Sequence, residues 1–157
     1  MKAVVIYYSL DGNTRFMAEA ISKQLNADII ELKTVGEKKR DRALKMLQGS
    51  WNVIFKNMPE INDFDSGIDK YELIFIGTPV WVGNYVPAFR TFFSRVKLKG
   101  KKIALFCCHR GGKGNVFNKM ETQLNGNEII GRADFFKVLK NKEKSLEKMD
   151  SWLNKII

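Results

Sequence analysis

The sequence predicts an α/β protein, a doubly wound three-layer sandwich built on a five-stranded parallel sheet. Two observations predict this fold class. Short apolar runs alternate along the chain with segments whose apolar residues recur at helical spacing. The first run, residues 2–8, is apolar almost throughout, which is typical of a strand covered on both faces. Strands and helices in alternation imply right-handed crossovers and helices on both faces of the sheet.

Five strands are expected from these runs. Residues 2–8 read Lys-Ala-Val-Val-Ile-Tyr-Tyr and are rich in β-branched and aromatic side chains, which favour strands. The other expected strands span residues 27–32, 73–76, 103–107 and 129–138. Four helices are expected between and after them, over residues 13–25, 87–96, 115–124 and 142–156. In the first of these helices, Phe16, Ala20, Ile21 and Leu25 form an apolar stripe.

The segment between the second and third strands, residues 34–71, is longer than a simple crossover. It contains a basic, helix-like piece at residues 40–47, followed by Pro59 and a loop-rich stretch at residues 62–67. We expect one helix and an extended return here.

Length and composition predict one soluble domain over residues 1–157, and the cysteine usage fits a cytoplasmic protein. We expect a monomer or weak dimer. No apolar stretch is long enough to insert into a membrane, and the start of the chain does not resemble a secretion signal. The two cysteines, Cys107 and Cys108, are adjacent, so they cannot link distant parts of the chain. Neither they nor the single histidine form a metal-binding pattern, and no metal is expected.

The net charge of +10 raises the question of a nucleic-acid partner. However, the basic residues are spread along the whole chain and are not interleaved with aromatic side chains, as they would be in a base-stacking surface. We therefore expect no nucleic-acid binding.

Ligands of open parallel sheets bind beyond the carboxyl ends of the strands, so the loops there are the candidate site. The first loop, residues 9–14, reads Ser-Leu-Asp-Gly-Asn-Thr and leads into a helix. Its hydroxyls, its glycine and the amides of the helix terminus suit a single phosphate group. A triphosphate is disfavoured, because the Gly-x-x-x-x-Gly-Lys pattern is missing. The alternative is that Ser9 and Thr14 only cap the helix.

The second loop, residues 77–85, contains Pro79, two glycines, Trp81 and Tyr85. Aromatic faces and glycine-containing backbone suit a planar heterocycle, whereas a turn alone needs no tryptophan. The alternative is that Trp81 is a core residue.

The third loop, residues 107–114, is basic and rich in glycine, which suits an anionic ligand. It does not match a phosphatase loop, because lysine and glycine stand at positions 113 and 114, where arginine is needed. His109 could donate a proton to a redox ligand or be an incidental surface residue. The cysteines are expected to be apolar filler, not nucleophiles.

The wording Tyr-Tyr-Ser-x-x-Gly-Asn-Thr, then Gly-Thr-Pro-Val-Trp, then the glycine-rich third loop resembles the flavodoxin family along nearly the whole chain. The resemblance implies a sheet order of 2-1-3-4-5 and one bound FMN. It implies that the first loop binds the FMN phosphate and that the other two loops bind the isoalloxazine ring. The implied FMN residues are Ser9, Asp11, Gly12, Asn13, Thr14, Thr78, Pro79, Val80, Trp81, Gly83, Asn84, Cys108, His109, Arg110, Gly111 and Gly112.

Three functions follow from this sequence. The first is electron transfer through FMN to a redox partner protein, with no residue assigned a catalytic role. The second is an FMN-dependent NAD(P)H or quinone oxidoreductase, which the basic charge favours because that reductant is anionic. Electron-carrying flavodoxins are typically acidic, and this chain is not. The third is a flavin-free signalling or interaction domain. However, the carboxylates that a receiver domain needs are missing, because those places hold Tyr7-Tyr8-Ser9 and Gly77-Thr78.

Overall fold

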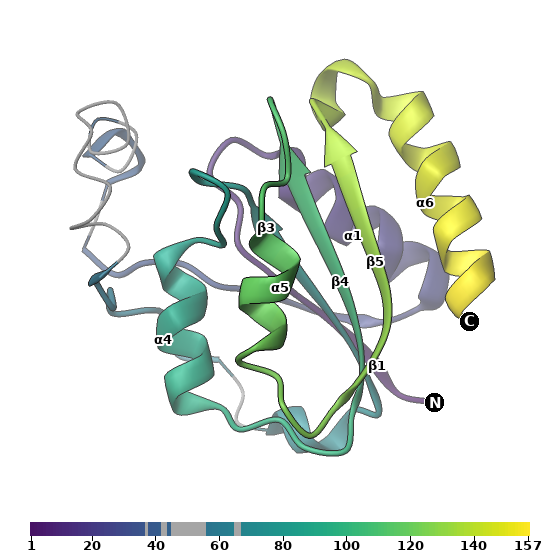
Figure 1. Ribbon diagram of the computed structural model, residues 1–157, viewed down its shortest axis with the longest axis horizontal. Coiled ribbons are helices and arrows are strands. Elements are labelled where there is room, and N and C mark those ends of the chain that lie inside the picture. The colour runs from purple at the N-terminus through teal and green to yellow at the C-terminus, as the bar shows by residue number, and fades with distance from the viewer. Residues whose placement is uncertain (37, 42–43, 45–55, 65–66) are drawn as a thin grey trace.

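The computed structural model describes the chain except for residue 37 and residues 42–43, 45–55 and 65–66 (Figure 1). Its centre is a five-stranded sheet of order β2-β1-β3-β4-β5, in which every neighbouring pair is parallel. The predicted fold class and strand order are therefore confirmed. The strands are β1 (Ala3–Tyr7), β2 (Asp28–Glu31), β3 (Leu73–Pro79), β4 (Lys102–His109) and β5 (Glu128–Phe136).

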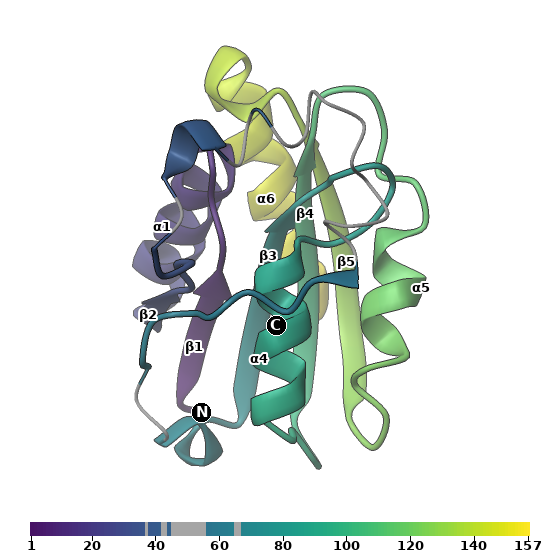
Figure 2. The same cartoon turned by 90° about the vertical axis from the view of Figure 1, so that its left-hand side faces the viewer.

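Helices cover both faces of the sheet (Figures 1 and 2). Helices α1 (Asn13–Leu25) and α6 (Lys142–Ile156) lie on one face, and α4 (Pro87–Arg95) and α5 (Val116–Glu121) lie on the other. Two short 3₁₀ helices complete the described elements: η1 (Gly67–Lys70) precedes β3, and η2 (Val138–Lys140) joins β5 to α6.

Two apolar cores hold these layers together. One core joins α1 and α6 to the sheet and includes Met17, Phe75 and Trp152. The other joins α4 and α5 to the opposite face and includes Phe89 and Phe117. Because residues of β1 point alternately to the two faces, Val4, Val5 and Ile6 are all fully buried. The prediction of a first strand covered on both sides is therefore confirmed.

Most element boundaries fall within a few residues of those expected, and β3 and α5 differ the most. β3 runs on to Pro79 because Thr78 and Pro79 still pair with β4, at Cys107 and Cys108. α5 is shorter than expected and ends at Glu121. β4 likewise runs on to His109, so both strands extend into the segments that were expected to be loops.

The segment over residues 34–71 is described only in part. Much of the helix expected at residues 40–47 lies outside the described residues. The return is held by one antiparallel bridge between Thr34 and Ile61, and it ends in η1, which was not predicted.

Within the described ranges, no helix is both long and apolar enough to cross a membrane. The same residues contain no cluster of three or more His, Cys, Asp or Glu side chains that could hold a metal ion.

Candidate functional site

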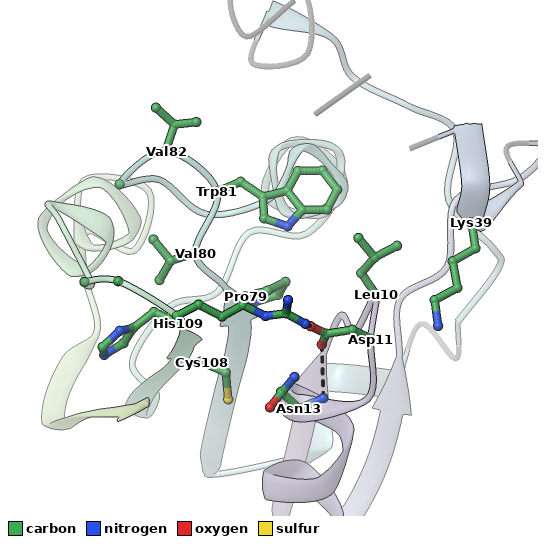
Figure 3. Close-up of a pocket in the computed structure, with 14 residues that line it drawn as sticks. Leu10, Asp11, Asn13, Lys39, Pro79, Val80, Trp81, Val82, Cys108 and His109 are labelled. Carbon is green, nitrogen blue, oxygen red and sulfur yellow. Dashed lines mark hydrogen bonds and ion pairs between the residues drawn. The ribbon is translucent and has the colours of Figure 1, made fainter. Parts of the chain in front are cut away.

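A cleft of about 610 Å³ lies beyond the carboxyl ends of β1, β3 and β4 (Figure 3). It brings together the three loops that the sequence singled out, although they are far apart along the chain. A cleft of this size is in the range that holds a small molecule or cofactor. Its lining comprises Leu10, Asp11, Asn13, Lys39, Pro79, Val80, Trp81, Val82, Gly83, Cys108, His109, Arg110, Gly111 and Gly112.

The first loop is tied into a tight turn before α1. The Ser9 hydroxyl accepts a hydrogen bond from the Gly12 amide at 3.1 Å, and the Asp11 carboxylate accepts one from the Asn13 amide at 3.2 Å. Gly12 has a φ of 92°, in the left-handed region that glycine adopts without strain. The turn therefore brings the start of α1 to the cleft.

The start of α1 fits an anionic group. No side chain caps the helix at Gly12, and the first helical bond runs from the Phe16 amide to the Gly12 carbonyl. The amides of Thr14 and Arg15 thus have no hydrogen-bond partner among the described residues. Free amides and the helix dipole together favour a phosphate at such a terminus.

The Thr14 hydroxyl adds a second polar group at this terminus. It is fully buried and forms no hydrogen bond with an oxygen or nitrogen atom of the described residues. Its neighbour is the Cys108 thiol, whose pKa it lowers slightly against the larger effect of burial. A buried hydroxyl with only a sulfur contact retains hydrogen-bonding capacity for a ligand.

Asp11 places a negative charge in the same loop, and Arg110 neutralises it. The Arg110 guanidinium donates to the Asp11 carboxylate at 2.7 Å, which links the first loop to the third. Burial alone would raise the pKa of Asp11, but hydrogen bonds from Asn13 and Arg110 lower it below its usual value. Asp11 is therefore an ionised, paired carboxylate at neutral pH.

The second loop forms a two-residue hairpin turn. Trp81 and Asn84 exchange backbone hydrogen bonds of 2.9 and 3.0 Å, and the residues between them, Val82 and Gly83, have φ angles of 49° and 67°. Positive φ at both central positions defines a type I′ turn, for which Asn-Gly is the preferred pair. Val82 is thus a β-branched residue in an unfavourable backbone conformation.

Trp81 is both a core residue and part of the cleft. Its side chain is buried and meets the Tyr8 ring edge-on, with centroids 6.0 Å apart. Figure 3 shows the indole beside the cleft, above Leu10 and Pro79. Tyr85, the other aromatic residue of this loop, packs edge-on against Phe93 in the core and does not line the cleft.

Two polar side chains, those of Thr78 and Asn84, stabilise the second loop through hydrogen bonds. The buried Thr78 hydroxyl donates to the Pro79 carbonyl at 2.9 Å and accepts from the Val86 amide at 3.3 Å. The Asn84 side chain accepts a hydrogen bond from the Tyr85 amide at 2.9 Å. Both therefore hold the shape of the turn.

The third loop packs against the second without intervening side chains. A Cβ on Gly114 would lie 2.5 Å from the Gly83 Cα, closer than any real contact. Gly111 and Gly112, by contrast, have open space around them. Close backbone approach at Gly114 therefore holds the second and third loops against each other.

The two thiols belong to opposite faces of β4. Cys108 lies at the cleft and Cys107 in the core beneath α4 and α5. Burial raises the pKa of the Cys108 thiol to about 12 and that of Cys107 still further. Both are neutral thiols at physiological pH, so neither has the properties of a nucleophile.

His109 turns its ring away from Asp11 and Asn13 (Figure 3). Its Nε2 lies 3.0 Å from the Asp134 carboxylate, and its ring contacts that of Phe136. Burial would raise the pKa of Asp134, but His109, Lys148 and Lys113 lower it below its usual value. His109 thus anchors the third loop to β5, although part of the residue borders the cleft.

The structure brings most of the expected site residues into the cleft. Those that do not line it are Ser9, Gly12, Thr14, Thr78 and Asn84. Thr14 is buried directly behind the cleft in the first turn of α1, and the other four shape or support the loops. The sequence analysis missed Leu10, Val82 and Lys39. The first two lie inside the loops it singled out, whereas nothing in the sequence marked Lys39.

Comparisons with known proteins show which chains are similar to this one. The Flavodoxin family model matches residues 2–156. A flavoprotein from Lactobacillus acidophilus NCFM, crystallised in complex with FMN, is 26% identical over 97% of this chain and 98% of its own, with a TM-score of 0.68.

Two further structures are similar. The apo-form of the flavoprotein from L. acidophilus NCFM is 28% identical over 89% of this chain and 95% of its own, with a TM-score of 0.64. Two-electron reduced Megasphaera elsdenii flavodoxin shares the fold, with 21% identity, 94% coverage of each chain and a TM-score of 0.56. Among curated proteins, none matches the chain.

Proposed function

This chain belongs to the flavodoxin family, and we propose from that premise that it holds one FMN in the cleft and transfers electrons through it. The observation that carries the proposal is the uncapped start of α1, with its free amides and buried Thr14 hydroxyl, at one end of a cleft walled by the second and third loops. A phosphate and a planar ring are the two parts of FMN that such a cleft would accept.

The first loop would hold the phosphate. The amides of Thr14 and Arg15 would donate to its oxygens, and the Thr14 hydroxyl would add a further bond. Arg110 keeps the Asp11 carboxylate paired, which reduces its repulsion of the phosphate. The FMN complex of the L. acidophilus flavoprotein supports this choice of cofactor.

The other two loops would hold the ring system. Trp81, Val80 and Pro79 supply apolar surface, and Gly111 and Gly112 let the backbone approach closely. When bound, FMN supplies the redox chemistry, while the protein positions it and adjusts its potential. The neutral thiol of Cys108 and the ring of His109, which turns toward Asp134, support a carrier without a catalytic side chain.

A comparison of FMN with riboflavin tests the binding site. The purified protein should show flavin absorption bands that remain after desalting, and the released flavin should be FMN. Thr14→Ala should weaken FMN binding by at least about tenfold, because a hydrogen bond to a charged group is worth about 1.5 to 3 kcal/mol. Riboflavin, which lacks the phosphate, should bind both forms equally. A protein that refuses both flavins would contradict the proposal.

The same preparation separates a carrier from an enzyme. A carrier loaded with FMN should oxidise NADPH and reduce a quinone only when a separate NADPH-dependent flavodoxin reductase is added. Direct oxidation of NADH or NADPH, with no reductase present, would instead identify an FMN-dependent oxidoreductase.

A further inference from the structure

Exposed apolar side chains lie at the same end of the sheet as the cleft. Val82 is 59% exposed on the second loop, Phe136 is 48% exposed at the end of β5, and Leu139 is 41% exposed in η2. Val82 follows β3, Phe136 ends β5 and Leu139 follows β5, and the carboxyl ends of these parallel strands lie at the same edge of the sheet as the cleft. The Leu139 amide also donates to the Asn13 side chain at 3.0 Å, which holds η2 against the first loop.

Cations accompany these apolar side chains. Lys137, Lys140 and Lys142 are exposed in and beside η2, and none of them is ion-paired with a residue that the structure describes. The Lys137 ammonium lies 4.8 Å from the centre of the Phe136 ring, so charge and apolar surface are in direct contact.

The carboxylates of this edge are largely neutralised within the chain. Asp11 pairs with Arg110, Glu31 with Arg15 and Lys33, and Asp134 with Lys113 and Lys148. Glu143 is exposed beside Lys142 and has no ion pair among the described residues, so the three unpaired lysines outnumber it, in line with the net charge of +10.

We propose that Val82, Phe136 and Leu139, with Lys137, Lys140 and Lys142, form a docking surface for a redox protein whose own contact face is acidic. This surface, hereafter the cleft rim, rests on the proposed function, because it places the partner over the cofactor cleft. Apolar side chains surrounded by charged ones are typical of transient protein interfaces. A small anion such as a dinucleotide phosphate would need only the lysines of this surface and would leave its apolar side chains unused.

The backbone of Val82 supports this choice of partner. A strained residue persists only where the surroundings hold it, and such residues cluster at functional sites. Val82 exposes an apolar side chain to solvent on the cleft rim, although asparagine would fit this position of the turn with less strain.

The test uses the FMN-loaded protein and measures binding by isothermal titration calorimetry. The probes are an acidic plant-type ferredoxin, a basic mitochondrial cytochrome c and a 20-nucleotide single-stranded DNA. The ferredoxin should bind with a Kd that weakens at least tenfold between low and high salt, and cytochrome c should not bind. DNA that binds more tightly than the ferredoxin at the same salt would overturn the proposal in favour of polyanion binding.

Charge reversal locates the surface. K137E/K140E should weaken ferredoxin binding at least tenfold, whereas K23E/K99E, with the same change in net charge on exposed residues at the opposite edge, should leave it within twofold. Equal losses in both variants, or none in either, would overturn the docking surface. Flavin absorbance recorded before each titration keeps a failure of docking distinct from a failure of FMN binding.

Discussion

The Arg110 guanidinium lies 2.7 Å from the Asp11 carboxylate, although 99 positions separate the two residues in the chain. This ion pair joins the loop before α1 to the loop after β4 across the cleft. Both side chains are partly exposed, at 73% and 36%, so the pair itself contributes little to stability. Its effect should fall on the charge of the cleft.

Removing Arg110 should weaken FMN binding. In Arg110→Ala, the Asp11 carboxylate stays charged beside the phosphate, and their repulsion should raise the Kd for FMN about tenfold at low salt. The double variant D11N/R110A should recover most of this loss, because the repelling charge is gone. Titration calorimetry at two salt concentrations measures the effect, with riboflavin as the control that should change less than twofold. Equal FMN affinities in Arg110→Ala and the double variant would contradict this account.

Replacing Val82 should stabilise the protein. Val82 has a φ of 49° in a type I′ turn, where asparagine is preferred. Val82→Asn should therefore raise the free energy of unfolding by about 1 kcal/mol, or the Tm by about 2 to 4 °C. Val35→Asn is the matched control, since Val35 is similarly exposed but lacks a positive φ. Thermal unfolding followed by circular dichroism should show no comparable gain for the control.

Gly114 should be intolerant of any side chain. A Cβ there would lie 2.5 Å from Gly83, and a φ of 53° adds strain. Gly114→Ala should therefore lower the Tm by several degrees and weaken FMN binding, because the second and third loops must separate. Gly112→Ala, at a position with open space, should leave the Tm within about 1 °C. Similar Tm values for the two variants would show that the loops are not packed as described.

The fold was predictable because its signal is local. Continuous apolar runs identify buried strands, and the apolar stripe from Phe16 to Leu25 identifies α1 with its observed bounds. Strand ends were less predictable. Thr78 and Pro79 extend β3 only because β4 lies beside them, and pairing between distant segments leaves no periodic pattern in the sequence.

The site was predictable at the level of loops but not of side-chain direction. Residue types at the ends of three strands marked the cleft, and parallel pairing brings those ends together. The ring of His109 turns toward Asp134 because this carboxylate, on β5, is within hydrogen-bond reach. Arg110 likewise reaches the Asp11 carboxylate of the first loop. Lys39 reaches the cleft from a segment in which apolar residues do not recur at regular spacing. Such contacts depend on the folded geometry.

The buried thiol at the cleft should make stability fall in alkaline solution. Burial raises the pKa of Cys108 from 9.0 to about 12, so the unfolded chain loses this proton first as pH rises. The contribution of the protonated Cys108 thiol to the free energy of unfolding is therefore complete below about pH 9 and is lost as pH rises toward 12. Between these limits, one thiol contributes a slope of about 1.4 kcal/mol per pH unit.

The effect of Cys108 on stability can be distinguished from that of other groups that titrate in this range. Tyr7, Tyr71 and Tyr85 also have raised pKa values because of burial, so the wild-type slope alone assigns nothing. Cys108→Ala should be less stable at pH 8, where it leaves a small cavity, yet lose stability less steeply above pH 9. Urea unfolding at pH 8, 9, 10 and 11 measures both slopes. Parallel curves for the two proteins would mean that the Cys108 thiol ionises as readily in the folded protein as in the unfolded chain.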